Sequence, residues 1–147
     1  MKIIFYLTLS LTLTLINLGG VYAKTLKDFT LPIYKTKDTF VLSQAVKKNK
    51  IVINFWASWC TACIQELAEL EALKIKYPDA SYIAINAGEK SNKIKRFLKK
   101  YKFSYLILLD KKKKTSKSLE VFSLPQTIVV DKNRAILYRG NRPPKKI

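Results

Sequence analysis

Two cysteines separated by two residues are the part of this sequence best suited to chemistry. Cys60 and Cys63 follow an apolar, β-branched run, and a helical pattern of apolar residues begins just after them. A helix start presents unpaired backbone N–H groups and the positive end of the helix dipole, and both stabilise a thiolate. Because the thiolate is the nucleophile in disulfide exchange, we expect Cys60 to attack and Cys63, one turn later, to resolve.

Two other uses of this cysteine pair are weakly supported. A structural zinc site normally needs four ligands, and the chain has no histidine and only these two cysteines. A purely structural disulfide between Cys60 and Cys63 would close a very short loop, so it would remove little entropy from the unfolded chain. We therefore expect a redox-active Cys60–Cys63 disulfide that requires no metal and no cofactor.

The elements that would position the two thiols alternate between strand and helix patterns. Residues 24–50 are expected to form an extended lead-in with a short strand at 39–42. Strands are predicted at 51–55, 81–87, 105–109, 127–130 and 136–138, and helices at 61–77, 92–101 and within 111–119. A hairpin turn is predicted at 131–134. This order predicts one α/β domain over residues 24–147, with a mixed central sheet flanked by helices.

The first 23 residues have the pattern of an export signal. Lys2 precedes an apolar stretch at 3–18, and small residues stand near Ala23, where a signal peptidase would cut. We expect a signal peptide, with an uncleaved membrane anchor as the alternative, although the apolar run is short for a membrane span. Either form places the domain in an extracytoplasmic, periplasmic-type compartment. Such compartments are oxidising, so a reductase there needs a source of electrons.

The chain is strongly basic. Lys plus Arg number 28 and Asp plus Glu number 10, which gives a net charge of +18. Lysine runs occur at 47–48, 99–100, 111–114 and 145–146. We interpret these runs as a solvated surface, with contact to an anionic membrane surface or an acidic partner as the alternative. Nucleic-acid binding is not expected, because it rests on charge alone and conflicts with the export signal.

The segment 55–63, Phe-Trp-Ala-Ser-Trp-Cys-Thr-Ala-Cys, resembles the active site of TlpA/ResA-like thiol-disulfide oxidoreductases of the redoxin family. The similarity extends over about residues 26–140. It implies a thioredoxin-like fold and an exported enzyme of the protein-disulfide reductase type, for example in cytochrome c maturation. The implied partners are substrate protein disulfides and a membrane thiol-disulfide electron carrier. A disulfide-forming oxidant or isomerase, or a basic binding protein with an incidental dithiol, are the alternatives.

The same resemblance implies roles for residues outside the cysteine pair. Glu66 stands where the family has an acidic residue, which can exchange a proton with the second cysteine. Leu124 and Pro125 match the family's cis-proline loop, which would hold an extended substrate segment. Trp59 is assigned to the substrate-binding surface as a packing and shielding group, and Asn54 is expected to be a hydrogen-bonded core amide.

The sequence departs from the family pattern at three places. Ala68 stands where many relatives have a helix-kinking proline, so the helix at 61–77 is expected to be straighter. Thr61 and Ala62 separate the cysteines, where the family most often has a proline before the second cysteine, so the redox potential does not carry over. After Tyr138 only nine residues follow, so the family's closing C-terminal helix is expected to be missing. We therefore expect one face of the sheet to be less covered, which would lower stability or leave a docking surface.

Overall fold

The computed structural model describes residues 24–147, so the predicted signal or anchor at 1–23 lies outside the described residues. The elements, in chain order, are β1 (Thr30–Pro32), β2 (Thr39–Val41), α1 (Leu42–Ala45), β3 (Ile51–Trp56), α2 (Thr61–Gln65), α3 (Leu67–Lys76), β4 (Ser81–Ala87), α4 (Ser91–Lys100), β5 (Leu106–Asp110), α5 (Lys114–Ser118), β6 (Gln126–Val130) and β7 (Ile136–Gly140). The predicted strands are therefore present, as are the predicted helices apart from a division of the one at 61–77, and the extended lead-in contains the β1–β2 hairpin.

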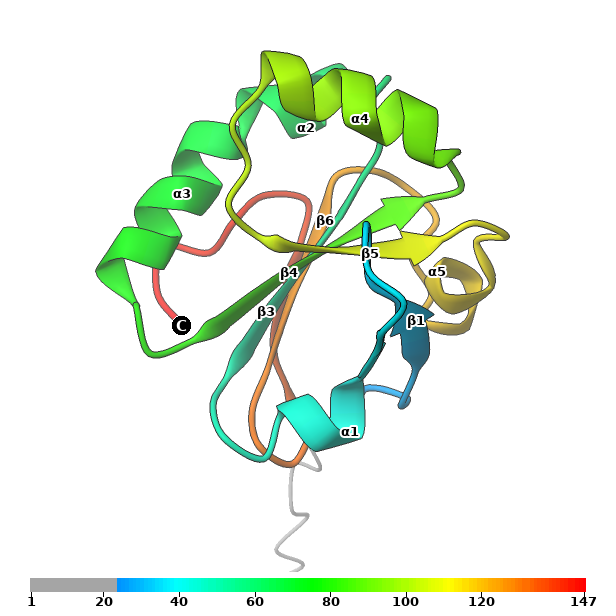
Figure 1. Cartoon of the computed structure of the whole chain (residues 1–147). Helices are drawn as coiled ribbons and strands as arrows, with labels where there is room; N and C mark the ends of the chain where they lie inside the picture. The colour runs from blue at the N-terminus through cyan, green and yellow to red at the C-terminus, as the bar shows by residue number, and fades with distance from the viewer. Residues whose placement is uncertain (1–23) are drawn as a thin grey trace, which may run out of the picture.

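The central sheet has five strands in the order β5-β4-β3-β6-β7. Strands β3, β4 and β5 run parallel, whereas β6 is antiparallel to β3 and β7 is antiparallel to β6. Helices α2, α3 and α4 cover one face, and α1 and the β1–β2 hairpin lie on the other (Figure 1). This arrangement confirms the predicted α/β fold with a mixed sheet.

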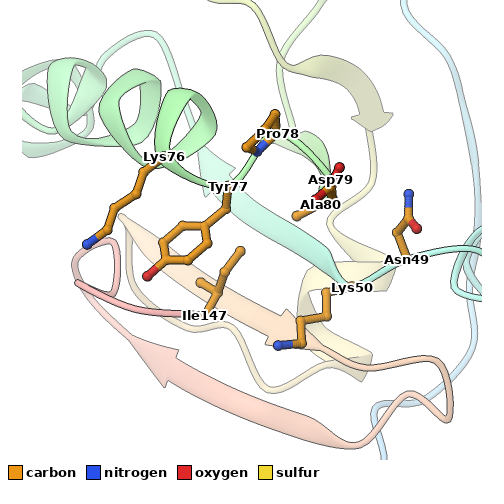
Figure 2. A pocket seen from close by; sticks show the side chains of 8 residues that line it. All are labelled: Asn49, Lys50, Lys76, Tyr77, Pro78, Asp79, Ala80 and Ile147. Carbon is orange, nitrogen blue, oxygen red and sulfur yellow. The ribbon is translucent and has the colours of Figure 1, made fainter.

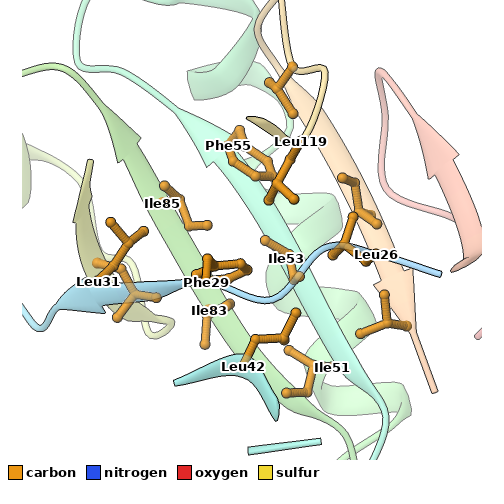
Figure 3. Packing of buried hydrophobic residues seen from close by; sticks show 14 of the residues in the cluster. Leu26, Phe29, Leu31, Leu42, Ile51, Ile53, Phe55, Ile83, Ile85 and Leu119 are labelled. Carbon is orange, nitrogen blue, oxygen red and sulfur yellow. The ribbon is translucent and has the colours of Figure 1, made fainter. Parts of the chain in front are cut away.

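The central strand β3 is buried on both faces. Ile51, Ile53 and Phe55 pack under the β1–β2 hairpin and α1, in the cluster that Figure 3 shows. Val52 and Trp56 point the other way, into the cluster formed with α3 and α4. Burial on both faces explains why this strand is a continuous apolar run rather than an alternating one.

The single helix predicted at 61–77 is wrong, because the structure divides it at Glu66. That residue has φ −86° and ψ −4°, which ends α2 and precedes the start of α3. Its carboxylate enters the core, where the side-chain amide of Asn54 donates to Oε1 at 2.8 Å. The apolar spacing continues unchanged across the break, so the periodicity of the sequence does not reveal it.

The described residues that follow β7 contain no helix, as expected. They do not leave the neighbouring surface bare, however, because they fold back along α3. The Lys76 ammonium donates to the carbonyl of Lys145 at 3.3 Å, and Ile147 packs on the cluster beneath α3. We expected one face of the sheet to be less covered because the closing helix is missing. This expectation is corrected in part, since an extended segment covers part of that face.

A hollow of about 320 Å³ lies where this segment ends (Figure 2). Ile147 lies beside Tyr77 there, and Lys50 lines the same hollow. Lys50 precedes β3, whereas the two cysteines follow its other end, so this hollow and the dithiol lie at opposite ends of the strand. Within residues 24–147, no helix has both the length and the apolar character needed to cross a membrane.

Candidate active site

The two cysteines lie where β3 ends and α2 begins. Cys60 is the N-cap of α2 and Cys63 is in its first turn, and their sulfurs are joined in a disulfide with the Cα atoms 5.2 Å apart. The backbone N–H of Cys63 donates to the Cys60 sulfur at 3.1 Å. Cys60 is 5% exposed and Cys63 2%. The same N–H can stabilise a Cys60 thiolate once the disulfide is reduced.

The two tryptophans before the cysteines differ in their surroundings. Trp56 is buried, with its ring centroid 4.6 Å from that of Phe97 and 5.7 Å from that of Phe103, so it is a packing group of the core. Trp59, which directly precedes Cys60, is 63% exposed. Its assignment to the substrate-binding surface, as a packing and shielding group, stays a prediction. An exposed indole at this position is available to contact a partner.

Glu66 is a buried carboxyl group one turn past Cys63. Its Oε1 accepts from Asn54, and within the described structure its Oε2 has no hydrogen-bond partner. Burial, together with the nearby charge of Glu69, raises the pKa of Glu66 to about 7, although the Asn54 hydrogen bond opposes this rise. Asn54 itself also donates to the Thr127 hydroxyl at 3.3 Å, as expected of a core amide.

The loop before β6 lies at the same end of the central strands as the dithiol. Phe55 of β3 is paired with Gln126 of β6, so residues 124–125 lie next to the chain that leaves β3 toward Cys60. The Leu124–Pro125 peptide bond is cis, as the resemblance implied. Leu124 and Trp59 line a common hollow of about 270 Å³. The structure thus brings the predicted substrate-binding residues Trp59, Leu124 and Pro125 to the same end of the central strands.

The sequence reasoning missed Glu89, a buried carboxylate in the loop after β4. Its Oε2 accepts from the backbone N–H of Ser58 at 2.7 Å and from the Asn86 amide at 2.9 Å, and its Oε1 accepts from the Ser58 hydroxyl at 2.6 Å. Burial raises the pKa of Glu89, but the hydrogen bonds from Asn86 and Ser58 outweigh it and lower that pKa. Glu89 therefore fixes the turn that carries Trp59 and Cys60. A single acidic residue after a strand gives no sequence signal of such a contact.

The groups available for chemistry in the described site are the two sulfurs and the Glu66 carboxyl. Among the described residues, no group of three or more His, Cys, Asp or Glu side chains is arranged to hold a metal ion. The geometry supports exchange of electrons through the sulfurs, with a proton acceptor one turn away.

A family profile described as Redoxin matches residues 22–146. The chain belongs to the Redoxin family. Thioredoxin-like protein YneN of Bacillus subtilis (strain 168) is 36% identical over 97 residues, which cover 63% of this chain and 56% of that protein. Thiol-disulfide oxidoreductase ResA of Bacillus thuringiensis subsp. konkukian (strain 97-27) is 29% identical over 93 residues, covering 62% and 54%. The matched part of the chain thus spans little more than half the length of these relatives.

Solved structures confirm the fold. A putative thiol:disulfide interchange protein DsbE from Chlorobium tepidum superposes with a TM-score of 0.73 at 24% identity, covering 83% of this chain and 86% of that one. StoA from Bacillus subtilis superposes with a TM-score of 0.66 at 20% identity, covering 83% and 92%. The thioredoxin-like fold and the resemblance to TlpA/ResA-like proteins are both confirmed.

Proposed function

We propose that this protein is a thiol-disulfide oxidoreductase that acts on protein disulfides through Cys60 and Cys63. The observation that carries the proposal is the position of the dithiol. Cys60 caps a helix, its sulfur accepts the N–H of Cys63, and the pair lies beside the cis Leu124–Pro125 loop. A structural disulfide would need neither the capped sulfur nor the adjoining substrate loop.

The reaction proceeds through two sulfur exchanges. The Cys60 thiolate attacks one sulfur of a substrate disulfide, a mixed disulfide forms, and the other substrate sulfur leaves as a thiolate. The Cys63 thiolate then attacks the Cys60 sulfur and releases the first substrate sulfur. The substrate gains two electrons and two protons, and the protein ends with the Cys60–Cys63 disulfide seen in the structure.

Glu66 manages the proton of Cys63 in this scheme. A carboxyl group with a pKa of about 7 exchanges protons readily near neutral pH, which is where the second exchange needs a base. Its unpaired Oε2 leaves one oxygen available for that proton. Proton transfer passes directly or through a water molecule between Glu66 and Cys63.

The substrate segment lies along the loop before β6. The backbone of Leu124 pairs with an extended segment, as an added strand would, and Trp59 contacts the same segment. Pro125 has no N–H, so it does not compete for these hydrogen bonds. The shared hollow of Trp59 and Leu124 supports this placement.

We further propose that the protein works outside the cytosol as a reductant of protein disulfides, for example in cytochrome c maturation. The leader-like sequence at 1–23 and the resemblance to TlpA/ResA-like proteins support this proposal. Because the compartment is oxidising, a membrane thiol-disulfide electron carrier returns the dithiol to its reduced form. An oxidant or isomerase is the alternative.

Reduction of insulin tests the activity. The protein should reduce insulin with a dithiol as electron source, and Cys60→Ala should lose this activity while retaining the circular dichroism of the fold. Equal rates for the two proteins would contradict the proposal. The reduction potential then decides the direction: a value near about −270 mV fits a reductant, and a value near about −120 mV fits an oxidant.

A further inference from the structure

Two basic hollows lie on either side of the exposed Trp59. The larger, about 500 Å³, is formed where α4 lies beside α2, and its lining includes Lys93, Arg96 and Lys100 (Figure 1). These three cations follow one another on a single face of α4, because their spacing is three and four residues. Ile94 is buried beneath them, so this face of α4 is fixed toward solvent.

The smaller hollow lies on the other side of the indole. Lys113 and Lys117 line it together with Leu124 of the cis-proline loop and Phe122, whose side chain is 83% exposed. The surface around Trp59, the residue before Cys60, thus has two exposed aromatic rings and two groups of cations. Exposed aromatic side chains flanked by cations favour contact with a partner that is both apolar and acidic.

The cations of both hollows lack acidic partners. No Asp or Glu lines either hollow, and the ion pairs within the described residues join Lys24 to Glu120 and Arg142 to Glu69. Two carboxylates lie close to the linings: Glu89 accepts from Ser58 of the larger hollow, and Asp110 accepts from Ser116 of the smaller one. Both oxygens of each already accept hydrogen bonds, although the charge of Lys93 does act on Glu89. The cations that line the two hollows outnumber these two carboxylates, so the surface keeps a net positive charge.

We propose that the two hollows form a docking surface for an extended acidic polypeptide segment that carries the disulfide to be reduced. This inference rests on the proposed function and adds the class of substrate. The disulfide reaches Cys60 beside Trp59, while Asp or Glu side chains flanking the substrate cysteines enter the hollows. A polypeptide fits better than a lipid surface, because the cations line two separate hollows that share only Trp59 rather than one continuous patch.

The test compares two synthetic peptides that each contain one internal disulfide. Both carry the same apolar residue at the same position. The positions flanking the cysteines are Glu in one peptide and Lys in the other. The dithiol form of the protein, freed of excess reductant, should reduce the acidic peptide about tenfold faster in a single turnover at low ionic strength. High salt should narrow this difference, because it screens exposed charges.

Two double variants on α4 distinguish an effect of the larger hollow from an effect of the protein's net charge. Arg96→Glu with Lys100→Glu reverses two charges that line the larger hollow, whereas Lys95→Glu with Lys99→Glu reverses two exposed charges outside it. The first variant should lose about tenfold in rate on the acidic peptide, and the second should stay within about twofold of the original protein. Equal losses in both variants would overturn the proposal, since net charge alone would then explain the preference.

Two further measurements give the remaining outcomes separate meanings. Reduction of uncharged bis(2-hydroxyethyl) disulfide measures the activity of the dithiol without a charged substrate, and the peptide rates of the original protein and of each variant are divided by its rate on this compound. If the original protein does not reduce this compound, the proposed function fails; if it does but shows no preference between the peptides, only the docking inference fails. Binding to phosphatidylglycerol vesicles that is lost only in Arg96→Glu with Lys100→Glu, with no peptide preference, would assign the hollows to a membrane and overturn the proposal.

Discussion

Two buried carboxyl groups near the dithiol have pKa values displaced in opposite directions. Glu66 accepts one hydrogen bond, and burial raises its pKa to about 7. Glu89 accepts three, from Asn86 and twice from Ser58, and these bonds outweigh burial and lower its pKa. Glu66 combines burial with the like charge of Glu69, whereas the hydrogen bonds and the charge of Lys93 outweigh burial at Glu89. Glu66 is thus suited to exchange a proton near neutral pH, whereas Glu89 stays ionised and positions the chain.

Glu66→Gln should change how stability depends on pH. The folded pKa of Glu66 is above its unfolded value of 4.5, so the folded state binds more protons than the unfolded state between pH 4.5 and about 7. The free energy of unfolding contributed by Glu66 therefore falls as pH rises through this range, by an amount on the order of 2–3 kcal/mol. Glu66→Gln removes this fall, so the variant should gain stability relative to the original protein as pH increases.

Urea unfolding of both proteins at pH 4.5 and pH 8 measures this difference. The comparison between the two proteins cancels the titration of the other carboxyl groups. Asp79→Asn is the control, because Asp79 is an exposed carboxylate between α3 and β4 and is not among the charges that shift the pKa of Glu66. A stability difference between Glu66→Gln and the original protein that is independent of pH would show that Glu66 titrates normally.

Glu89→Gln should slow catalysis through the position of the Cys60 turn. Loss of the charged acceptor weakens the bonds to Ser58, so the turn that carries Trp59 is less well fixed, and insulin reduction should fall about tenfold. Glu71→Gln is a matched control, because the Glu71 carboxylate likewise accepts from the backbone N–H and hydroxyl of Ser104. It should leave the rate unchanged. A similar fall in both variants would argue against a positioning role.

At the scale of elements, Asp110 holds the lysine-rich α5 in place. It is the last residue of β5 and is buried, and its carboxylate accepts from the backbone and hydroxyl of Ser116, both at 2.7 Å. The N-cap of α5, Lys113, has φ 55° and makes no side-chain hydrogen bond to the helix. Asp110, which lies outside the helix, instead accepts from backbone N–H groups of its first turn. The position of α5 in turn places Lys113 and Lys117 at the smaller hollow.

Asp110→Asn should reduce the free energy of unfolding by about 1–3 kcal/mol, because a buried charged acceptor is replaced by a neutral one. Equilibrium unfolding in urea measures the change. Asp79→Asn, at an exposed position between α3 and β4, should stay within about 0.5 kcal/mol of the original protein. Equal stability of both variants would contradict the capping role of Asp110.

At the scale of the whole molecule, the central strands of the sheet could be predicted because they are buried on both faces. The runs at 51–55 and 81–87 are continuous and apolar, and they became β3 and β4 within one residue. The interruption at Glu66 could not be predicted, since the apolar spacing continues across it, and the contact of Glu66 with Asn54 forms only in the folded chain. The contact of Glu89 with Ser58 joins residues 31 positions apart, so it too arises only once the fold has formed.

The parts of the site that are encoded in short sequence motifs could be predicted. Cys60 and Cys63 are bonded as the spacing indicated, and the Leu124–Pro125 bond is cis as the resemblance implied. The basic surface around Trp59 was visible in the sequence only as scattered lysines. It forms a docking surface because α4 and α5 both lie beside the turn after β3 that carries Trp59.

The most direct test of the central claim is which cysteine forms the mixed disulfide. Cys63→Ala and Cys60→Ala are each mixed with a disulfide peptide, and the mass of the covalent adduct is followed over time. We expect a stable adduct on Cys60 in Cys63→Ala, and little or none on Cys63 in Cys60→Ala over the same interval. Adducts forming equally fast in both variants, or faster on Cys63, would contradict the account.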